Sequence, residues 1–99
     1  MTNADPAKFG LGQVVSTLQA LRFCRQHRID ISTLLMRHAL RDWGDVCTVD
    51  RIANDAAMFD GSRILSLYSF TAGRVWVLTE AVGEDGTRAS TCIMLPSDY

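Results

Sequence analysis

The chain has 99 residues, 47% of them hydrophobic, and its ten basic residues nearly cancel its eleven acidic ones to give a formal charge of −1. This length is typical of one domain with a core that needs no disulfide or metal. A balanced charge gives no overall attraction to nucleic acids or anionic membranes, and no apolar run approaches the roughly 18 residues of a membrane span.

The N-terminal stretch MTNADPAKFG lacks the basic and apolar regions of a signal peptide. Cys24, Cys47 and Cys92 are odd in number and widely spaced. We therefore expect no disulfide framework and a cytoplasmic location. The domain organisation we expect is a flexible arm over residues 1–10 and one domain over residues 11–99.

The first elements expected are a short strand or extended lead-in at FGLGQVV (residues 9–15) and then two helices. Ser16 or Thr17 is a natural N-cap for the first helix, LQALRFCRQH. Asp30 or Ser32 caps the second, which should end near residue 41. Its apolar stripe has helical spacing and consists of Ile31, Leu34, Leu35 and His38.

A third helix follows the cap-like residues Thr48 and Asp50, and Gly61 is suited to end it in the left-handed conformation. Three of its residues share one face, namely Ile52, Ala56 and Phe59. After Gly61 the period changes to two, over residues 63–70, 74–81 and 88–95. The predicted fold class is α+β, with about three N-terminal helices packed on a C-terminal three-stranded antiparallel β-meander.

Simple closure of both hairpins predicts that Tyr68 lies opposite Trp76, and Trp76 opposite Ile93. The core face is then expected to contain Leu65, Leu67, Val75, Val77, Cys92 and Met94. The opposite face would be an exposed apolar patch, and we expect four of its residues to bind a protein partner: Tyr68, Phe70, Trp76 and Ile93. The partner could be a second copy of the chain. Alternatively, the N-terminal arm folds across this face with Phe9 and Leu11.

The segment RDWGD forms a corner between the second and third helices. An aspartate next to glycine favours tight turns and caps backbone amides, and a tryptophan can fill the seam between helices. The same segment, with His38 before it, could instead supply acceptors to a partner. The candidate corner residues are His38, Asp42, Trp43, Gly44 and Asp45.

A basic strip is the main local charge feature, and it consists of Arg22, Arg25 and Arg28, with Arg37 and Arg41 nearby. Such a strip is either a solvated helix face or a contact for an acidic partner or a phosphate backbone. No aromatic residues alternate with it, which argues against binding of single strands.

No nucleotide-binding, GxSxG or HExxH motif is present, and FGLGQV lacks the third glycine of a dinucleotide site. We therefore expect no metal, no cofactor and no catalytic residues. An enzyme would have to be built around His38, Asp42, Asp45 and Cys47, where a loop cysteine before a helix favours a reactive thiol.

Two motifs resemble a family of small uncharacterised bacterial proteins carried on plasmids and integrative elements, some of them labelled plasmid-related protein. They are RHxxxDWGD, from Arg37 to Asp45, and LPxxY, from Leu95 to Tyr99. The resemblance covers residues 11–99, and the chain departs from it in TEAVGEDGTRASTCIML. It implies a mobile-element setting and no catalytic residues. A restriction–modification label borne by some relatives does not fit, because 99 residues hold neither a methyltransferase motif nor a target-recognition domain.

The function we expect is therefore a non-enzymatic protein-binding accessory module of a mobile genetic element, for example an anti-defence or host-interaction factor. A small nucleic-acid-associated protein that uses the basic strip is the first alternative, and a small enzyme with a His/Asp site is the second.

Overall fold

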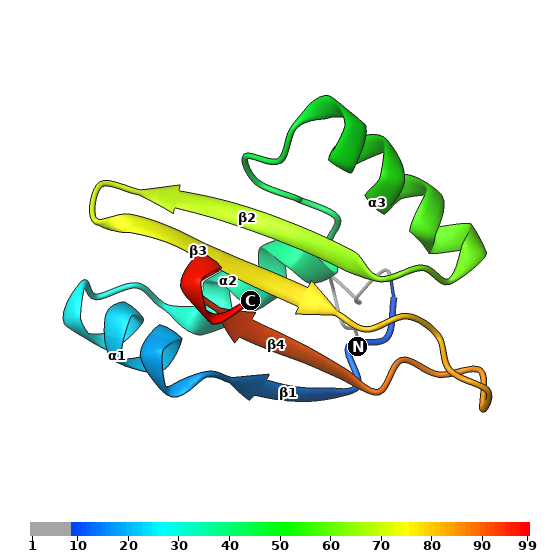
Figure 1. The fold of residues 1–99 in the computed structure, drawn as a ribbon, viewed down its shortest axis with the longest axis horizontal. Helices are drawn as coiled ribbons and strands as arrows, with labels where there is room; N and C mark the ends of the chain where they lie inside the picture. The colour runs from blue at the N-terminus through cyan, green and yellow to red at the C-terminus, as the bar shows by residue number, and fades with distance from the viewer. Residues whose placement is uncertain (1–8) are drawn as a thin grey trace, which may run out of the picture.

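A mixed four-stranded sheet lies at the centre of the computed structural model, which describes residues 9–99 (Figure 1). In chain order the elements are β1 (Gln13–Ser16), α1 (Leu18–Gln26), α2 (Ile31–Ala39), α3 (Thr48–Asp60), β2 (Ile64–Phe70), β3 (Gly73–Thr79), β4 (Ser90–Met94) and the 3₁₀ turn η1 (Pro96–Asp98). The predicted α+β class is confirmed.

The sheet has one strand more than predicted. The expected meander of β2, β3 and β4 is present, with both strand pairs antiparallel. The segment left open as strand or lead-in supplies β1, which pairs in parallel with β4 and gives the order β1-β4-β3-β2. The prediction of a purely antiparallel three-stranded sheet was therefore wrong.

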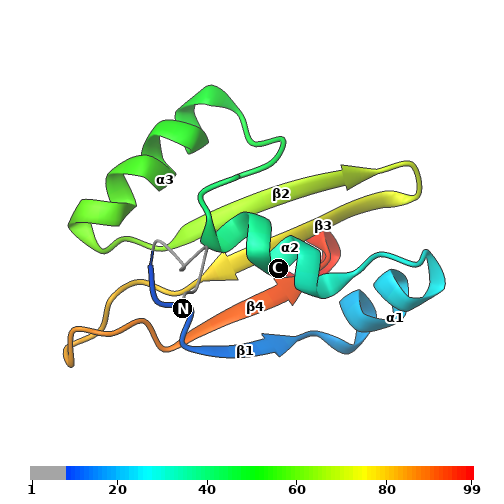
Figure 2. The same cartoon turned by 180° about the vertical axis from the view of Figure 1, so that it is seen from behind.

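The helices take up two different positions around the sheet. Helix α2 crosses one face (Figure 2), while η1 lies on the other face, in red in front of β3 in Figure 1. Helix α3 stands beside β2, at the sheet edge, rather than over the sheet. Helix α1 contributes Ala20 and Cys24 to the core, and α2 contributes Leu34. These residues pack against four residues of the sheet: Tyr68, Val75, Val77 and Ile93.

Helix ends follow the expected caps with one exception. The Thr17 hydroxyl accepts a hydrogen bond from the Ala20 amide, and the Asp30 carboxylate accepts one from the Ser32 amide. Gly61 ends α3 with φ of 79°. The N-cap of α3 is Cys47, which makes no side-chain capping bond, so Thr48 and Asp50 lie inside the helix rather than before it.

The strand register differs from the prediction by one residue in both hairpins. Tyr68 pairs with Val75, and Trp76 lies between Leu67 and Met94. Because β2 and β3 connect through only two residues, 71 and 72, β3 begins one residue earlier than expected. A shift of one residue reverses the face of a strand. The predicted core face therefore holds for Val75 and Val77 but not for β2 or β4.

Residues at the N-terminal boundary of the described region pack on the helix-covered side. The ring of Phe9 lies 5.3 Å from that of His38 and 6.0 Å from that of Trp43, between centroids. Phe9 packs in the cluster that contains Ile64, on the same sheet face as Tyr68 and Ile93 and away from Trp76, so the alternative in which the arm folds across the expected face holds only in part. The expected arm over residues 1–10 falls mostly on residues 1–8, outside the described residues. None of the helices within residues 9–99 combines the length and apolar character that a membrane crossing requires.

Candidate functional site

The RDWGD corner closes the outer edge of β2. The Leu67 amide donates a 3.0 Å hydrogen bond to the Trp43 carbonyl, and the Asp45 amide donates a 2.7 Å bond to the Leu67 carbonyl. The Asp45 carboxylate also accepts from the Ser69 amide. Two residues earlier on β2, the Leu65 carbonyl accepts a hydrogen bond from the Asn54 side chain of α3, and the Leu65 amide donates one to it. The β2 edge of the sheet is thus occupied and cannot recruit another strand.

The inner side of the corner rests on strand β2. The Tyr68 hydroxyl donates a 2.6 Å hydrogen bond to the Asp42 carbonyl, and the guanidinium of Arg37 lies 4.4 Å from the Tyr68 ring centroid. Arg37 also pairs with the Asp42 carboxylate at 2.6 Å, and this bond holds the pKa of Asp42 below its ordinary value. Burial raises the pKa of Tyr68 to about 12, so its hydroxyl remains a donor at neutral pH.

The indole of Trp43 is buried and its Nε1 donates a 2.9 Å hydrogen bond to the Asp55 carboxylate on α3. The same carboxylate oxygen lies 3.6 Å from Arg41. Trp43 therefore fills the seam between α2 and α3, and its polar atom is already bonded within the chain. These contacts favour the structural role among the two considered for the corner.

His38 is fully buried and joins a chain of hydroxyl groups across the sheet. Its Nδ1 lies 2.6 Å from Ser66 Oγ, and its Nε2 lies 2.8 Å from Thr79 Oγ1. Thr79 Oγ1 lies 2.7 Å from Thr91 Oγ1, which donates to the Leu11 carbonyl.

The carbonyl at the end of this chain determines the direction of every hydrogen bond in it. Because Thr91 donates to Leu11, Thr91 accepts from Thr79, and Thr79 accepts from the Nε2–H of His38. His38 is then the neutral Nε2–H form, and its Nδ1 accepts from Ser66. Burial lowers the pKa of His38 to about 4, and the positive charge of Arg88 adds to this effect. Both ring nitrogens are thus occupied.

The residues of the His/Asp alternative are not brought together by hydrogen bonding. His38 faces Ser66 and Thr79, Asp42 binds Arg37 and the Gly44 amide, and Asp45 binds Ser69. Cys47 is exposed at the start of α3. Among residues 9–99 no cluster of three His, Cys, Asp or Glu side chains could hold a metal ion.

The four residues expected to share a binding face lie on opposite sides of the sheet. Tyr68 and Ile93 are each 1% exposed beneath the helices, and Phe70 packs against the same core. Trp76 lies on the other face, where its ring packs against that of Tyr99 at 5.4 Å. The Tyr99 hydroxyl accepts a hydrogen bond from Arg63, so the C-terminal LPxxY segment covers part of this face.

The predicted basic strip is exposed. Arg22 and Arg25 lie on α1, and Arg28 follows it in the left-handed conformation, with φ of 56°. Arg37 and Arg41 instead contact Asp42 and Asp55. Arg37 and Arg41 are therefore partly exposed but already paired with acidic residues, unlike the three arginines of the strip.

Helix α3 carries an apolar face that points to solvent. Phe59 is 92% exposed, Val49 74% and Ile52 63%. Together with the exposed Ala53 and Ala56 they form a continuous row at helical spacing, called here the α3 stripe. The buried residues Asn54 and Ala57 lie on the other side of the helix. The sequence pattern placed Ile52, Ala56 and Phe59 on one face. It did not show whether another element would cover that face.

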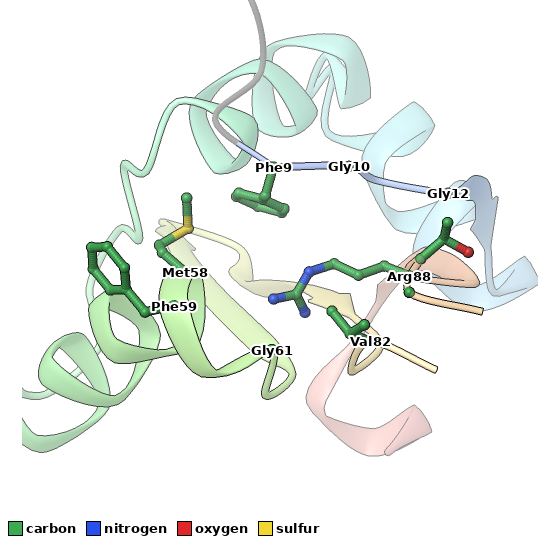
Figure 3. Close-up of a pocket in the computed structure, with 10 residues that line it drawn as sticks. Phe9, Gly10, Gly12, Met58, Phe59, Gly61, Val82 and Arg88 are labelled. Atoms are coloured by element: carbon green, nitrogen blue, oxygen red, sulfur yellow. The ribbon is translucent and has the colours of Figure 1, made fainter. Parts of the chain in front are cut away.

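A cleft of about 590 Å³ adjoins this stripe at Phe59 (Figure 3). Its polar centre is Arg88, which is 9% exposed and donates hydrogen bonds to the carbonyls of Ala57, Ser62 and Glu80. Burial lowers the pKa of this guanidinium from its ordinary value. Sequence reasoning missed Arg88, since one arginine in a loop before a strand carries no recognisable motif.

Comparisons with protein-family models, with curated proteins and with solved structures find no match to this chain.

Proposed function

We propose that this chain is a non-enzymatic protein-binding module and that the α3 stripe is its contact surface. The observation that carries the proposal is the exposure of Val49, Ile52 and Phe59 along one side of one helix. Scattered surface apolar residues need no explanation, but a contiguous apolar row marks an interaction site. A mobile-element role, as an accessory or anti-defence factor, is proposed from the resemblance of the RHxxxDWGD and LPxxY motifs alone.

The partner that fits best is an amphipathic helix of a different protein, apolar along one face and basic at its flanks. Asp50 and Asp60 are exposed at the two ends of the α3 stripe. In a parallel pair of α3 helices, Asp50 meets Asp50 and Asp60 meets Asp60. In an antiparallel pair centred on Asp55, Asp50 of one helix meets Asp60 of the other. Like charges in contact oppose association, so the stripe favours a basic partner over a second copy.

The test is affinity capture from a host-cell lysate with the wild-type chain and with Ile52→Glu and Phe59→Glu, washed at low and high salt. Met36→Glu is the matched control, because Met36 is 60% exposed on α2 and lies outside the stripe. We expect one protein to be retained at high salt by the wild type and the control, and lost with both stripe variants. Capture that survives both substitutions would refute the assignment of the stripe.

Two other outcomes would redirect the proposal. A wild-type dimer that Ile52→Glu converts to a monomer, measured by analytical ultracentrifugation, would make a second copy the occupant. Recovery of nucleic acid alone, lost as salt rises and lost when Arg22, Arg25 and Arg28 are replaced, would favour the basic strip instead.

A further inference from the structure

The Arg88 cleft combines a buried cation with apolar walls. Figure 3 shows the guanidinium extending between Phe9, Met58 and Val82. The volume of the cleft, about 590 Å³, lies within the range of small-molecule sites. Such sites are mostly apolar with a few fixed polar groups. Three carbonyls hold the guanidinium in position, so it needs no rearrangement to meet a ligand.

The hydrogen bonds of Arg88 leave part of its donor set free. Nη1 donates to Ser62 and Glu80, and Nη2 donates to Ala57. A guanidinium has five N–H groups, so the Nε–H and one Nη2–H have no acceptor among residues 9–99. These two nitrogens are neighbours on the guanidinium plane, and paired donors of this kind bind a carboxylate in a bidentate manner.

The charge of Arg88 also lacks a contacting carboxylate. Within residues 9–99, Arg88 forms no ion pair. Burial lowers the pKa of Arg88 and the charge of Asp60 partly offsets this effect, but no ion pair joins the two residues. The Asp60 carboxylate instead accepts a hydrogen bond from the Ser62 amide. A buried cation gains most from an anion that reaches its free donors.

We propose that this cleft binds a small monocarboxylic acid with an apolar body. The carboxylate would meet the free Nε–H and Nη2–H of Arg88, and the hydrocarbon part would lie against Phe9, Met58 and Val82. Both linear and aromatic acids share this chemistry. The site is separate from the protein contact proposed above, apart from Phe59 at their boundary.

The experiment is a titration of the ¹⁵N-labelled full chain, followed by ¹H–¹⁵N NMR, with octanoate, 3-phenylpropionate, octanamide and inorganic phosphate. We expect one of the two acids to shift the Arg88 Nε–H signal and the Gly61 and Val82 amides saturably, and the tighter acid identifies a linear or an aromatic ligand. Octanamide keeps the apolar body but not the charge, and it should bind at least about tenfold more weakly than octanoate.

Three results would overturn the proposal. They are the absence of saturable shifts with either acid, equal affinity for octanamide, and equal affinity for phosphate, which would leave the apolar walls without a role. These comparisons need no change to Arg88, whose replacement would also remove three hydrogen bonds to carbonyls.

A variant of the cleft wall provides an independent check. Gly10 lines the cleft, and a Cβ there would meet no atom within 4 Å, so Gly10→Phe adds a ring at the cleft wall without strain and should weaken acid binding about tenfold or more. Leu18→Phe, at an exposed position on α1, is the control and should leave binding unchanged. Undiminished binding by Gly10→Phe would place the ligand elsewhere and refute the site.

Discussion

The Tyr68 hydroxyl donates a 2.6 Å hydrogen bond to the main-chain carbonyl of Asp42. A strand residue that the sequence placed on a binding surface thus holds the corner between α2 and α3 from inside the core. The edge-pairing bonds of Trp43 and Asp45 with Leu67 reinforce the same connection.

Tyr68→Phe tests this connection by removing one oxygen atom. The Asp42 carbonyl would lose its Tyr68 donor, and we expect the free energy of unfolding to fall by about 1–2 kcal/mol. Urea denaturation monitored by circular dichroism measures this change. An unchanged midpoint would mean that water replaces the hydroxyl without cost.

Gly44→Ala should be far more damaging than Gly86→Ala. Both glycines have positive φ, 74° and 81°, so both substitutions strain the backbone by about 1 kcal/mol. A Cβ at Gly44 would also collide with the Leu67 carbonyl, whereas one at Gly86 meets open space. We expect Gly44→Ala to cost at least about 4 kcal/mol or to prevent folding. Similar melting temperatures for the two variants would contradict the edge pairing.

His38 should make stability depend on pH. The folded chain keeps it neutral down to its lowered pKa of about 4, while the unfolded chain takes up a proton near pH 6.5. Stability is therefore complete above about pH 6.5 and falls by up to about 3 kcal/mol as the pH decreases toward 4. Chemical denaturation at pH 7 and at pH 5 measures the difference.

His38→Gln is the control for that slope, because glutamine is polar but does not titrate. The variant should be less stable at pH 7, and its stability should change less between pH 7 and pH 5. If the slope is the same in both proteins, carboxylates rather than His38 are its source.

The three cysteines should differ in reactivity. Cys47 is exposed, whereas Cys24 is buried and burial raises its pKa. The partly buried Cys92 also has a raised pKa, mainly through burial. Because the thiolate is the reactive form, mass spectrometry after a short iodoacetamide pulse should find Cys47 modified first. Equal labelling of Cys24 in the native chain would indicate local opening of the core.

Elements with strong local signals could be predicted from the sequence. Thr17, Asp30 and Gly61 end or begin helices where their capping chemistry indicates, and Leu34 and His38 of the predicted stripe are buried. Strand β1 cannot be predicted with the same certainty, because four residues after Gly10 and Gly12 are too few to show a period and depend on β4 for pairing.

The buried face of the sheet could not be predicted because it contains hydroxyl groups. Aliphatic residues such as Leu65 and Leu67 indicated one core face, yet the buried face carries Ser66, Thr79 and Thr91 among its apolar residues. Burial of a hydroxyl is unfavourable unless it finds a partner, and here His38 supplies that partner from a distant helix. The α3 stripe shows the complementary difficulty, since helical spacing does not reveal which face meets solvent.

The neighbouring positions of β1 and β4 affect how the chain can fold during synthesis. Leu11 and Thr91 share a hydrogen bond across nearly the whole described chain, and β1 finds its strand partner only in β4. Contacts between such distant residues form slowly, because a long loop must close first. A ribosome-bound chain that has not yet exposed residues 90–94 thus cannot complete its sheet or the hydroxyl chain around His38. The last steps of folding therefore follow translation of β4, and until then the core under α1 and α2 lacks the side chain of Ile93.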